Sequence, residues 1–492
     1  MVIYSVALLL IIGLLAILIC LSHVWRIRLV AGYILLVSMT FAIILVVIFG
    51  FNRLWVWALL FASLYSLFNL LRIVRSKIQI EHLRRICLKT ASRLLLLQVL
   101  VVLIAVILTW TPFIHKSRWM LLALIQLALA VLLLSSTSRH KRVAKRIQLA
   151  AEVIDKDAPT LTVAIPARDE TESLNQCLRS VLDCNYPKLE VLVLDDQSTT
   201  RRTPEIIRSF AHDGVEFVTG KPAPKNWVAK NWAYQQLLEV SNGEIILFCG
   251  ADTRFDTEAL RFLVTALVDR KKSMISIMPK NLAFNPYGWR FIQPLRYAWE
   301  ISLPRRLVNR PPILSTCWVA KREFLMKSGG LKAVTRRIVP ESYFAKFATE
   351  QDGYSFFMYD GVMSDKQSDE QVETAIRIRY PQLHRQPELA ALLSMGEIIA
   401  LLGSLPLFIM GLVELYVPVI ILSGLSIVTM IYMFAMISNM AYRRRLVLNG
   451  LMWPVAIVID LWLVNLSMWR YEFGNVLWKG RSVNPSVMNH RE

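Results

Sequence analysis

The chain has 492 residues, of which 55% are hydrophobic and only 19% charged, and its mean hydropathy is +0.46. A soluble protein of this length rarely carries so large an apolar share, so the composition argues against a wholly soluble protein and predicts membrane spans beside a folded domain. The formal net charge is +20, but lysine and arginine cluster beside the apolar runs, which favours cytoplasmic loops and anionic lipid over nucleic acid. The six cysteines are scattered, with no Cys-x-x-Cys pair, so neither a disulfide framework nor a zinc site is expected.

Residues 1–146 are predicted to form an N-terminal membrane region of about five helices. A bilayer core of about 30 Å takes about 20 helical residues, a length that each of five apolar runs approaches. The first run lacks the basic start and the cleavage site of a signal peptide, so we interpret it as an anchor. Basic stretches at 72–93 and 139–146 are typical of cytoplasmic loops, which places the N-terminus outside. The five runs are 3–21, 29–49, 54–71, 94–110 and 119–135.

Residues 147–389 differ in character and predict a soluble α/β domain. Short apolar runs such as "LTVAIP", "LEVLVLDD", "VEFVTG", "EIILFCG" and "SMISIMP" alternate with helix-like stretches such as "ESLNQCLRSVLD". This alternation is typical of βαβ units and a mostly parallel sheet. Such sheets bind ligands at the carboxyl ends of their strands.

The chain becomes apolar again over 390–470, where two to three further spans are predicted, and it ends in a polar tail at 471–492. The apolar runs lie at 394–412, 416–437 and 451–466. The stretch 287–310 mixes tryptophan and phenylalanine with arginine, including Arg305 and Arg306. That mixture predicts a segment on the membrane surface that brings a lipid to the site, although a core helix with a basic outer face is the alternative.

Two pairs of acidic residues follow predicted strands. Asp169 and Glu170 in "IPARDE" precede a helix, where carboxylates either cap the helix or bind a ligand, and both interpretations stay open. Asp195 and Asp196 in "VLVLDDQST" come directly after a buried strand. Because adjacent acids repel each other, their position at the mouth of a sheet favours a ligand role.

Two further clusters point to phosphate and metal binding. Lys230 in "GKPAPKNWVAKNWAYQQL" opens a helix, where a cation opposes the helix dipole but suits a phosphate. Trp227 and Trp232 in the same stretch fit packing better than a substrate platform. Asp252 in "CGADT" is able to hold a hard divalent cation that bridges a diphosphate.

The order and spacing of these motifs resemble a family 2 glycosyltransferase of GT-A fold. The similar branch is membrane-bound and includes ceramide glucosyltransferases and carotenoid- and hopanoid-associated glycosyltransferases. The matching elements are "IPARDE", "VLVLDDQST" and "GKPAPKNWVAKNWA", the last being the most specific, and "WKGR" near the end of the chain. The resemblance covers about 160–345 well and the later apolar runs loosely.

The resemblance implies an α/β GT-A domain inserted between N- and C-terminal transmembrane helices, with the domain in the cytoplasm of a multi-pass plasma-membrane protein. It implies transfer of a sugar from a nucleotide-diphosphate sugar to a lipid or other membrane-associated acceptor, with Mg²⁺ or Mn²⁺ as cofactor. Asp252 would hold the metal and contribute to catalysis, and Glu341 would be the general base, with Asp352 as its competitor. The substrate-binding residues implied are Asp169, Glu170, Asp195, Asp196, Lys230, Trp232 and Gly250.

The chain departs from the family pattern at three places. Gly250 stands where the first aspartate of Asp-x-Asp is found, and Pro340-Glu341-Ser342 stands where a Glu-Asp pair holds the general base. The Gln-x-x-Arg-Trp motif of processive synthases is reduced to "IRIRY" at 376–380, which disfavours a polysaccharide polymerase. A catalytically degenerate relative that binds a nucleotide or a partner, and a processive synthase, remain the alternatives.

Two expectations follow from the resemblance. If the tail is cytoplasmic, as the family suggests, one of the three late apolar runs does not span, and we expect this to be 394–412. We also expect metal-dependent donor binding that Gly250→Asp strengthens and Asp252→Asn abolishes, because the second aspartate of the motif reaches the metal in the family.

Overall fold

The computed structural model describes residues 117–147, 158–282, 291–302, 311–383, 396–442, 447–473 and 476–483, with a few single residues between 385 and 394. The first four predicted apolar runs and the basic stretch 72–93 lie outside the described residues. So do Arg305 and Arg306. Of the stretch 287–310 the structure describes 291–302, where Phe291, Arg296 and Trp299 are buried, so this part fits the alternative of a core helix better than a segment on the membrane surface.

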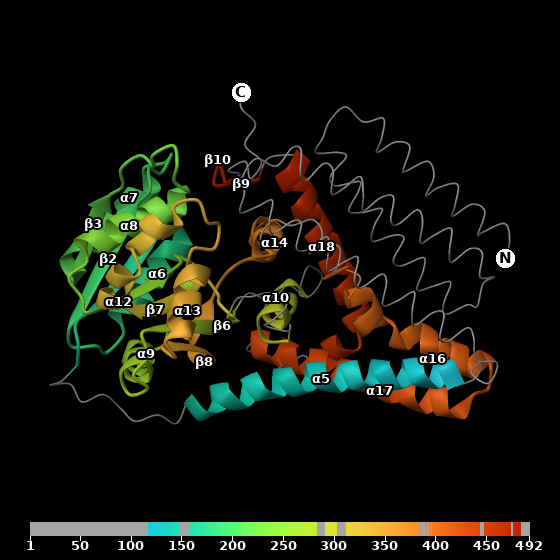
Figure 1. Ribbon diagram of the computed structural model, residues 1–492. Helices are drawn as coiled ribbons and strands as arrows, with labels where there is room; N and C mark the ends of the chain where they lie inside the picture. Colours follow the sequence, from blue (N-terminus) through green and yellow to red (C-terminus); the bar gives the residue numbers. More distant parts are fainter. Residues whose placement is uncertain are drawn as a thin grey trace.

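The predicted α/β domain is confirmed by an eight-stranded mixed sheet in the order β3-β2-β1-β4-β7-β6-β8-β5 (Figure 1). Strands β1 to β4 run parallel, and only β7 and β5 run antiparallel to their neighbours. All five strand-like runs quoted from the sequence appear as strands. The strands are β1 Leu161–Ala167, β2 Leu189–Asp195, β3 Val215–Thr219, β4 Ile245–Cys249, β5 Thr253–Phe255, β6 Met274–Asn281, β7 Cys317–Lys321 and β8 Tyr354–Ser364.

Helices cover both faces of the sheet because its central strands are apolar on both sides. Val163 and Ile165 of β1 point into one buried cluster, while Ala164 between them points into the other. The first cluster lies under α6 Glu172–Leu182, α7 Arg202–Ser209 and α9 Ala259–Val268; the second lies under α8 Ala229–Val240, α12 Arg322–Lys327 and α13 Glu341–Glu350. Short 3-10 helices, η3 Ala211–Asp213 and η4 Gly330–Val334, complete the domain.

A helical region lies beside the α/β domain, and its two long helices, α5 and α17, run side by side (Figure 1). Trp119–Arg139 of α5 and Val417–Ala441 of α17 are long and apolar enough to cross a membrane. Both helices expose large apolar side chains, such as Leu132 and Val428. The helices here are α5 Ser117–Ile147, α10 Ile292–Ile301, α14 Ser368–Gln382, α16 Ser404–Val413, α17 Val417–Ala441 and α18 Trp453–Phe473, with the π-helical turn η5 Ile398–Leu402 and the 3-10 turn η6 Val447–Gly450.

The last described segment returns to the α/β domain. Helix α18 lies crosswise to α5 and α17, against α14, and a two-stranded hairpin follows it (Figure 1). The hairpin consists of β9 Leu477–Trp478 and β10 Arg481–Ser482, with Lys479 and Gly480 in its turn. Its "WKGR" sequence therefore sits beside the edge of the sheet at which β1 and β2 end.

Candidate active site

The carboxyl ends of β1, β2 and β4 bring the predicted acidic residues to one edge of the sheet. Ala167 at the end of β1 lies opposite Asp195 at the end of β2, and Asp252 follows β4, the other neighbour of β1. Because these strands are parallel, all three ends lie on the same side. The structure therefore places the predicted acids where a ligand of such a sheet binds.

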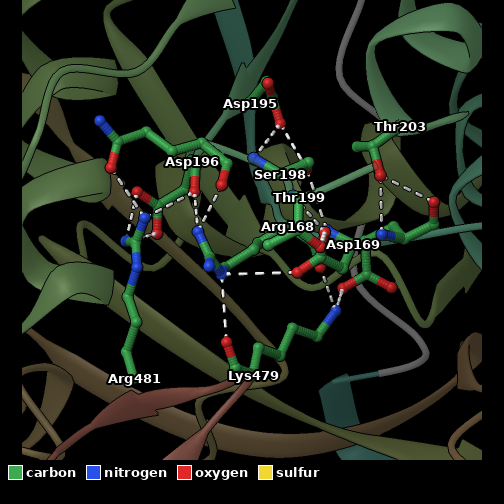
Figure 2. A network of polar contacts seen from close by, with 11 residues as sticks. Arg168, Asp169, Asp195, Asp196, Ser198, Thr199, Thr203, Lys479 and Arg481 are labelled. Atoms are coloured by element: carbon green, nitrogen blue, oxygen red, sulfur yellow. Dashed lines mark hydrogen bonds and ion pairs between the residues drawn. The ribbon is translucent and has the colours of Figure 1, made fainter. Parts of the chain in front are cut away.

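Asp169 and Asp195 are held by hydroxyl and backbone N–H donors. Asp169 Oδ1 accepts hydrogen bonds from the backbone N–H and the hydroxyl of Thr199, at 2.6 and 2.9 Å, and Asp195 Oδ1 accepts from Ser198 (Figure 2). Burial opposes ionisation of Asp169, but the bonds from Thr199 and the charge of Arg168 hold its pKa below the usual value. The Asp169 side chain is still 25% exposed, so it is accessible to a ligand.

Asp196 and Glu170 contact the C-terminal hairpin. Arg481 Nη1 lies 3.0 Å from each carboxylate oxygen of Asp196, whose side chain is 1% exposed, and Lys479 forms an ion pair with Glu170 (Figure 2). Arg168 joins the two contacts by donating to the carbonyl oxygens of Asp196 and Lys479. Sequence reasoning grouped both acids with the substrate-binding residues and missed these contacts; the only signal was the "WKGR" motif.

Asp252 is half-buried next to a cation. Its Oδ2 accepts a hydrogen bond of 2.9 Å from the Ser364 hydroxyl, and Lys366 Nζ lies 3.9 Å from the same oxygen. Burial opposes ionisation of Asp252, but the charge of Lys366 and the bond from Ser364 hold its pKa below the usual value. A Cβ added at Gly250 would lie 2.4 Å from Asp252 Oδ1, so the carboxylate leans over the space that the missing side chain leaves.

The residues around Asp252 do not fit a divalent cation. Among the residues that the structure describes, no three histidine, cysteine, aspartate or glutamate side chains are grouped to hold a metal ion. One oxygen of Asp252 is already bonded to Ser364, and the Lys366 ammonium beside it repels a second cation. The Mg²⁺ or Mn²⁺ that the family resemblance implies remains a prediction.

Lys230 and Glu341 form a buried ion pair. Lys230 at the start of α8 lies 2.5 Å from Glu341 Oε1, and the Glu341 side chain, the first of α13, is fully buried. The other oxygen, Oε2, has no hydrogen-bond partner in the structure. This arrangement suits holding Lys230 in place, and a substrate hydroxyl reaches Glu341 only after a rearrangement.

Two other predicted residues, Asp352 and Trp232, contact protein groups that suggest a structural role. Asp352, the competitor for the base, precedes β8 at the opposite edge of the sheet, is fully exposed and pairs with Lys272, so it is too far from the site for that role. Trp232 donates its indole N–H to the carbonyl oxygen of Lys221 and packs edge-on against Trp227. The packing interpretation of the tryptophans fits this geometry.

Three cations near Asp252 were not predicted as site residues. Burial lowers the pKa of Lys366; the charge of Asp252 opposes this effect, and the charges of Arg377 and Arg296 add to it. Arg296 comes from α10 and Arg377 from α14, so the cluster joins three segments that are far apart in the sequence. The available signals were the "IRIRY" remnant, which contains Arg377, and the basic stretch that contains Arg296.

Comparison with known proteins agrees with this geometry. Residues 162–329 match the family model "Glycosyl transferase family 2". Probable glycosyltransferase YdaM of Bacillus subtilis is 32% identical over 122 residues, which are 24% of this chain and 29% of that protein. The 4,4'-diaponeurosporenoate glycosyltransferase of Staphylococcus aureus is 28% identical over 140 residues, 28% of this chain and 36% of that protein. The aligned region thus spans about a third of these relatives.

Among solved structures, the mannosyltransferase PcManGT from Pyrobaculum calidifontis, in complex with GDP-Man and Mn²⁺, is similar to 69% of this chain over 99% of its own, with 18% identity and a TM-score of 0.43. The mixed sheet, the acids at its strand ends and the family match define an α/β domain of the glycosyltransferase class. In particular, residues 162–329 match the family 2 glycosyltransferase model and form most of a GT-A-like mixed sheet.

Proposed function

We propose that this protein is a membrane-associated glycosyltransferase that moves one sugar from a nucleotide-diphosphate donor to a lipid acceptor. The observation that carries this proposal is that carboxylates and cations lie together at one edge of the sheet. Asp169 and Asp195 offer carboxylate oxygens to the hydroxyl groups of a nucleoside, and Lys230 and Lys366 offer positive charge to a diphosphate.

In the proposed reaction, the acceptor oxygen attacks the anomeric carbon while the bond from that carbon to the diphosphate oxygen breaks. The electron pair leaves with the diphosphate, whose growing negative charge the cations stabilise. A carboxylate takes the acceptor proton, and in an inverting displacement it lies on the face opposite the leaving group. Two residues are candidates for this base. Glu341 is the one that the family resemblance implies, but its side chain is buried. Glu370, in the first turn of α14, has an exposed carboxylate.

A membrane-associated acceptor is supported by the helical region. Helices α5, α16 and α17 expose apolar side chains, including Ile125, Ile409 and Ile421. Helix α10, which carries Arg296, packs against both α17 and α14 and so connects the helical region to the site. The name of the Staphylococcus aureus relative, a diaponeurosporenoate glycosyltransferase, is consistent with a lipid-like acceptor.

The test is sugar transfer by the full-length protein in detergent. UDP-glucose, UDP-N-acetylglucosamine and GDP-mannose, each labelled in the sugar, are incubated with the protein and a membrane lipid extract. We expect label from one donor in the lipid phase, lost in Asp195→Asn and kept in Asp213→Asn, an exposed acid of η3. Donor binding without hydrolysis or transfer would support the degenerate alternative, and products longer than one sugar would support the processive synthase.

A further inference from the structure

The surroundings of Asp252 contain more positive than negative charge. Lys366, Arg296 and Arg377 act on one another and on Asp252, and Glu370 is the other acid that acts on Lys366. Glu373, which pairs with Arg470, also acts on Arg377, so four cations including Arg470 face three carboxylates. The cluster lies at the end of β4 and β8, where the leaving group of the proposed reaction is expected.

The guanidinium groups of this cluster lack carboxylate partners. Arg296 is 7% exposed, and its Nε has no hydrogen-bond partner. Within the described part of the chain, neither Arg296 nor Arg377 forms an ion pair, and Asp252, at 3.9 Å, is the carboxylate nearest to Lys366. Because burying an unpaired cation is costly, the buried Arg296 and the half-buried Arg377 and Lys366 are suited to an anion that the protein binds.

The same residues explain the loss of the first aspartate. With glycine at 250, Asp252 Oδ1 occupies the space of the missing side chain, and Oδ2 faces Ser364 and Lys366. The carboxylate that would bind a metal thus orients a lysine. The Lys366 ammonium lies at Oδ2 of this carboxylate, where it repels a divalent cation.

We propose that Lys366, Arg296 and Arg377 replace the divalent cation and bind the donor's diphosphate directly, so that donor binding is independent of metal. This inference rests on the proposed function. During transfer, the bond between the anomeric carbon and the diphosphate oxygen breaks, and the electron pair stays on that oxygen. The ammonium and guanidinium groups stabilise the resulting charge, and the acceptor's proton goes to the catalytic carboxylate.

The deciding experiment is calorimetric titration of the full-length protein with UDP and with GDP, each in EDTA and in Mn²⁺. We expect one nucleotide to bind in EDTA with an affinity within about threefold of that in Mn²⁺. Lys366→Met should weaken binding in EDTA by about 10- to 100-fold, the range for one charge-assisted contact, and Lys366→Arg should restore most of it. The matched control is Lys327→Met, an exposed lysine on α12 that should not change binding.

The outcomes separate the inference from the function. Binding in Mn²⁺ that disappears in EDTA would overturn metal independence and leave the proposed glycosyltransferase intact. Absence of binding in both conditions would overturn both proposals. Since the comparison of EDTA with Mn²⁺ uses the native protein, the result does not depend on whether a variant folds. Binding in EDTA that Lys366→Met leaves unchanged would remove Lys366 from the site.

Discussion

At the scale of single residues, burial decides whether Glu341 acts as the general base or as the ion-pair partner of Lys230. A general base must reach the acceptor hydroxyl, and Glu341 is fully buried beneath Lys230. We predict that Glu370→Gln lowers kcat by about 100-fold, because it removes the proton acceptor. Glu341→Gln should instead weaken donor binding, because Lys230 loses its partner.

These two variants are compared by steady-state kinetics and by nucleotide titration of the same preparations. Asp369→Asn, in the same turn of α14 as Glu370, is the matched control and should retain kcat. The opposite pattern, in which Glu341→Gln loses turnover with full donor binding, would assign the base to Glu341 as the family resemblance predicts.

Gly250 gives a second prediction at this scale. A side chain there would press its Cβ against Asp252 Oδ1, so Gly250→Asp must turn the carboxylate of Asp252 away. Two carboxylates would then face the site, and we predict that nucleotide binding becomes stronger with Mn²⁺ than with EDTA by about tenfold or more. Gly250→Ala, which adds the Cβ without the charge, is the control. If Gly250→Asp binds equally in EDTA and Mn²⁺, the position does not govern the metal response.

At the scale of elements, the C-terminal hairpin is a structural part of the site. Asp196 is buried and Arg481 Nη1 contacts both of its carboxylate oxygens, so removing this cation leaves a buried carboxylate without its ion-pair partner. We predict that Arg481→Gln destabilises the protein by about 3 kcal/mol, and that adding Asp196→Asn to it recovers part of the loss. Thermal unfolding in detergent measures both.

The hairpin prediction has a local readout as well. Limited proteolysis should cleave the chain after α18 faster in Arg481→Gln than in the native protein, because the hairpin is released from Arg168 and Asp196. Arg470→Gln serves as the control, since it breaks an ion pair with the exposed Glu373 of α14 and leaves Asp196 and its partner in place. Equal cleavage rates in all three proteins would show that the hairpin does not depend on this ion pair.

The elements also show what the sequence could and could not predict. The runs that became β1, β2, β3, β4 and β6 are short, apolar and bounded by turn residues, so local pattern was sufficient to find them. Strands β7 and β8 were not predicted, because these segments become strands through pairing with neighbouring strands and not through a local sequence pattern. Asp169, Asp195 and Asp252 follow strands and were found, whereas the Asp196–Arg481 pair joins residues 285 positions apart, which no local pattern reveals.

At the scale of the whole molecule, α18 is better suited to the membrane surface than the run 394–412. Its large exposed apolar side chains, Val455, Val458, Trp462 and Trp469, repeat every three, four and seven residues and so form one stripe. Its opposite side packs against α14 and buries Asp460. We therefore predict that 396–413 and α17 are the two crossings and that the tail and the α/β domain lie on one side of the membrane.

We predict that a cysteine at Ser486 is labelled by an impermeant maleimide only after the cells are permeabilised. A cysteine at Leu415, in the turn between α16 and α17, should be labelled in intact cells, because that turn lies on the far side. The native protein gives the background from its own cysteines. Labelling of the Ser486 site in intact cells would mean that all three late apolar runs cross the membrane.

The central claim is that this chain transfers a single sugar to a lipid, and a mass-spectrometric comparison of membrane lipids tests it most directly. Lipids are extracted from cells that express the native protein, the Asp252→Asn variant or no protein. We predict a lipid species heavier by one sugar unit with the native protein, reduced at least about tenfold in Asp252→Asn, because Lys366 loses the carboxylate that orients it. Identical lipid profiles in all three samples, with the native protein present in the membrane, would contradict the claim.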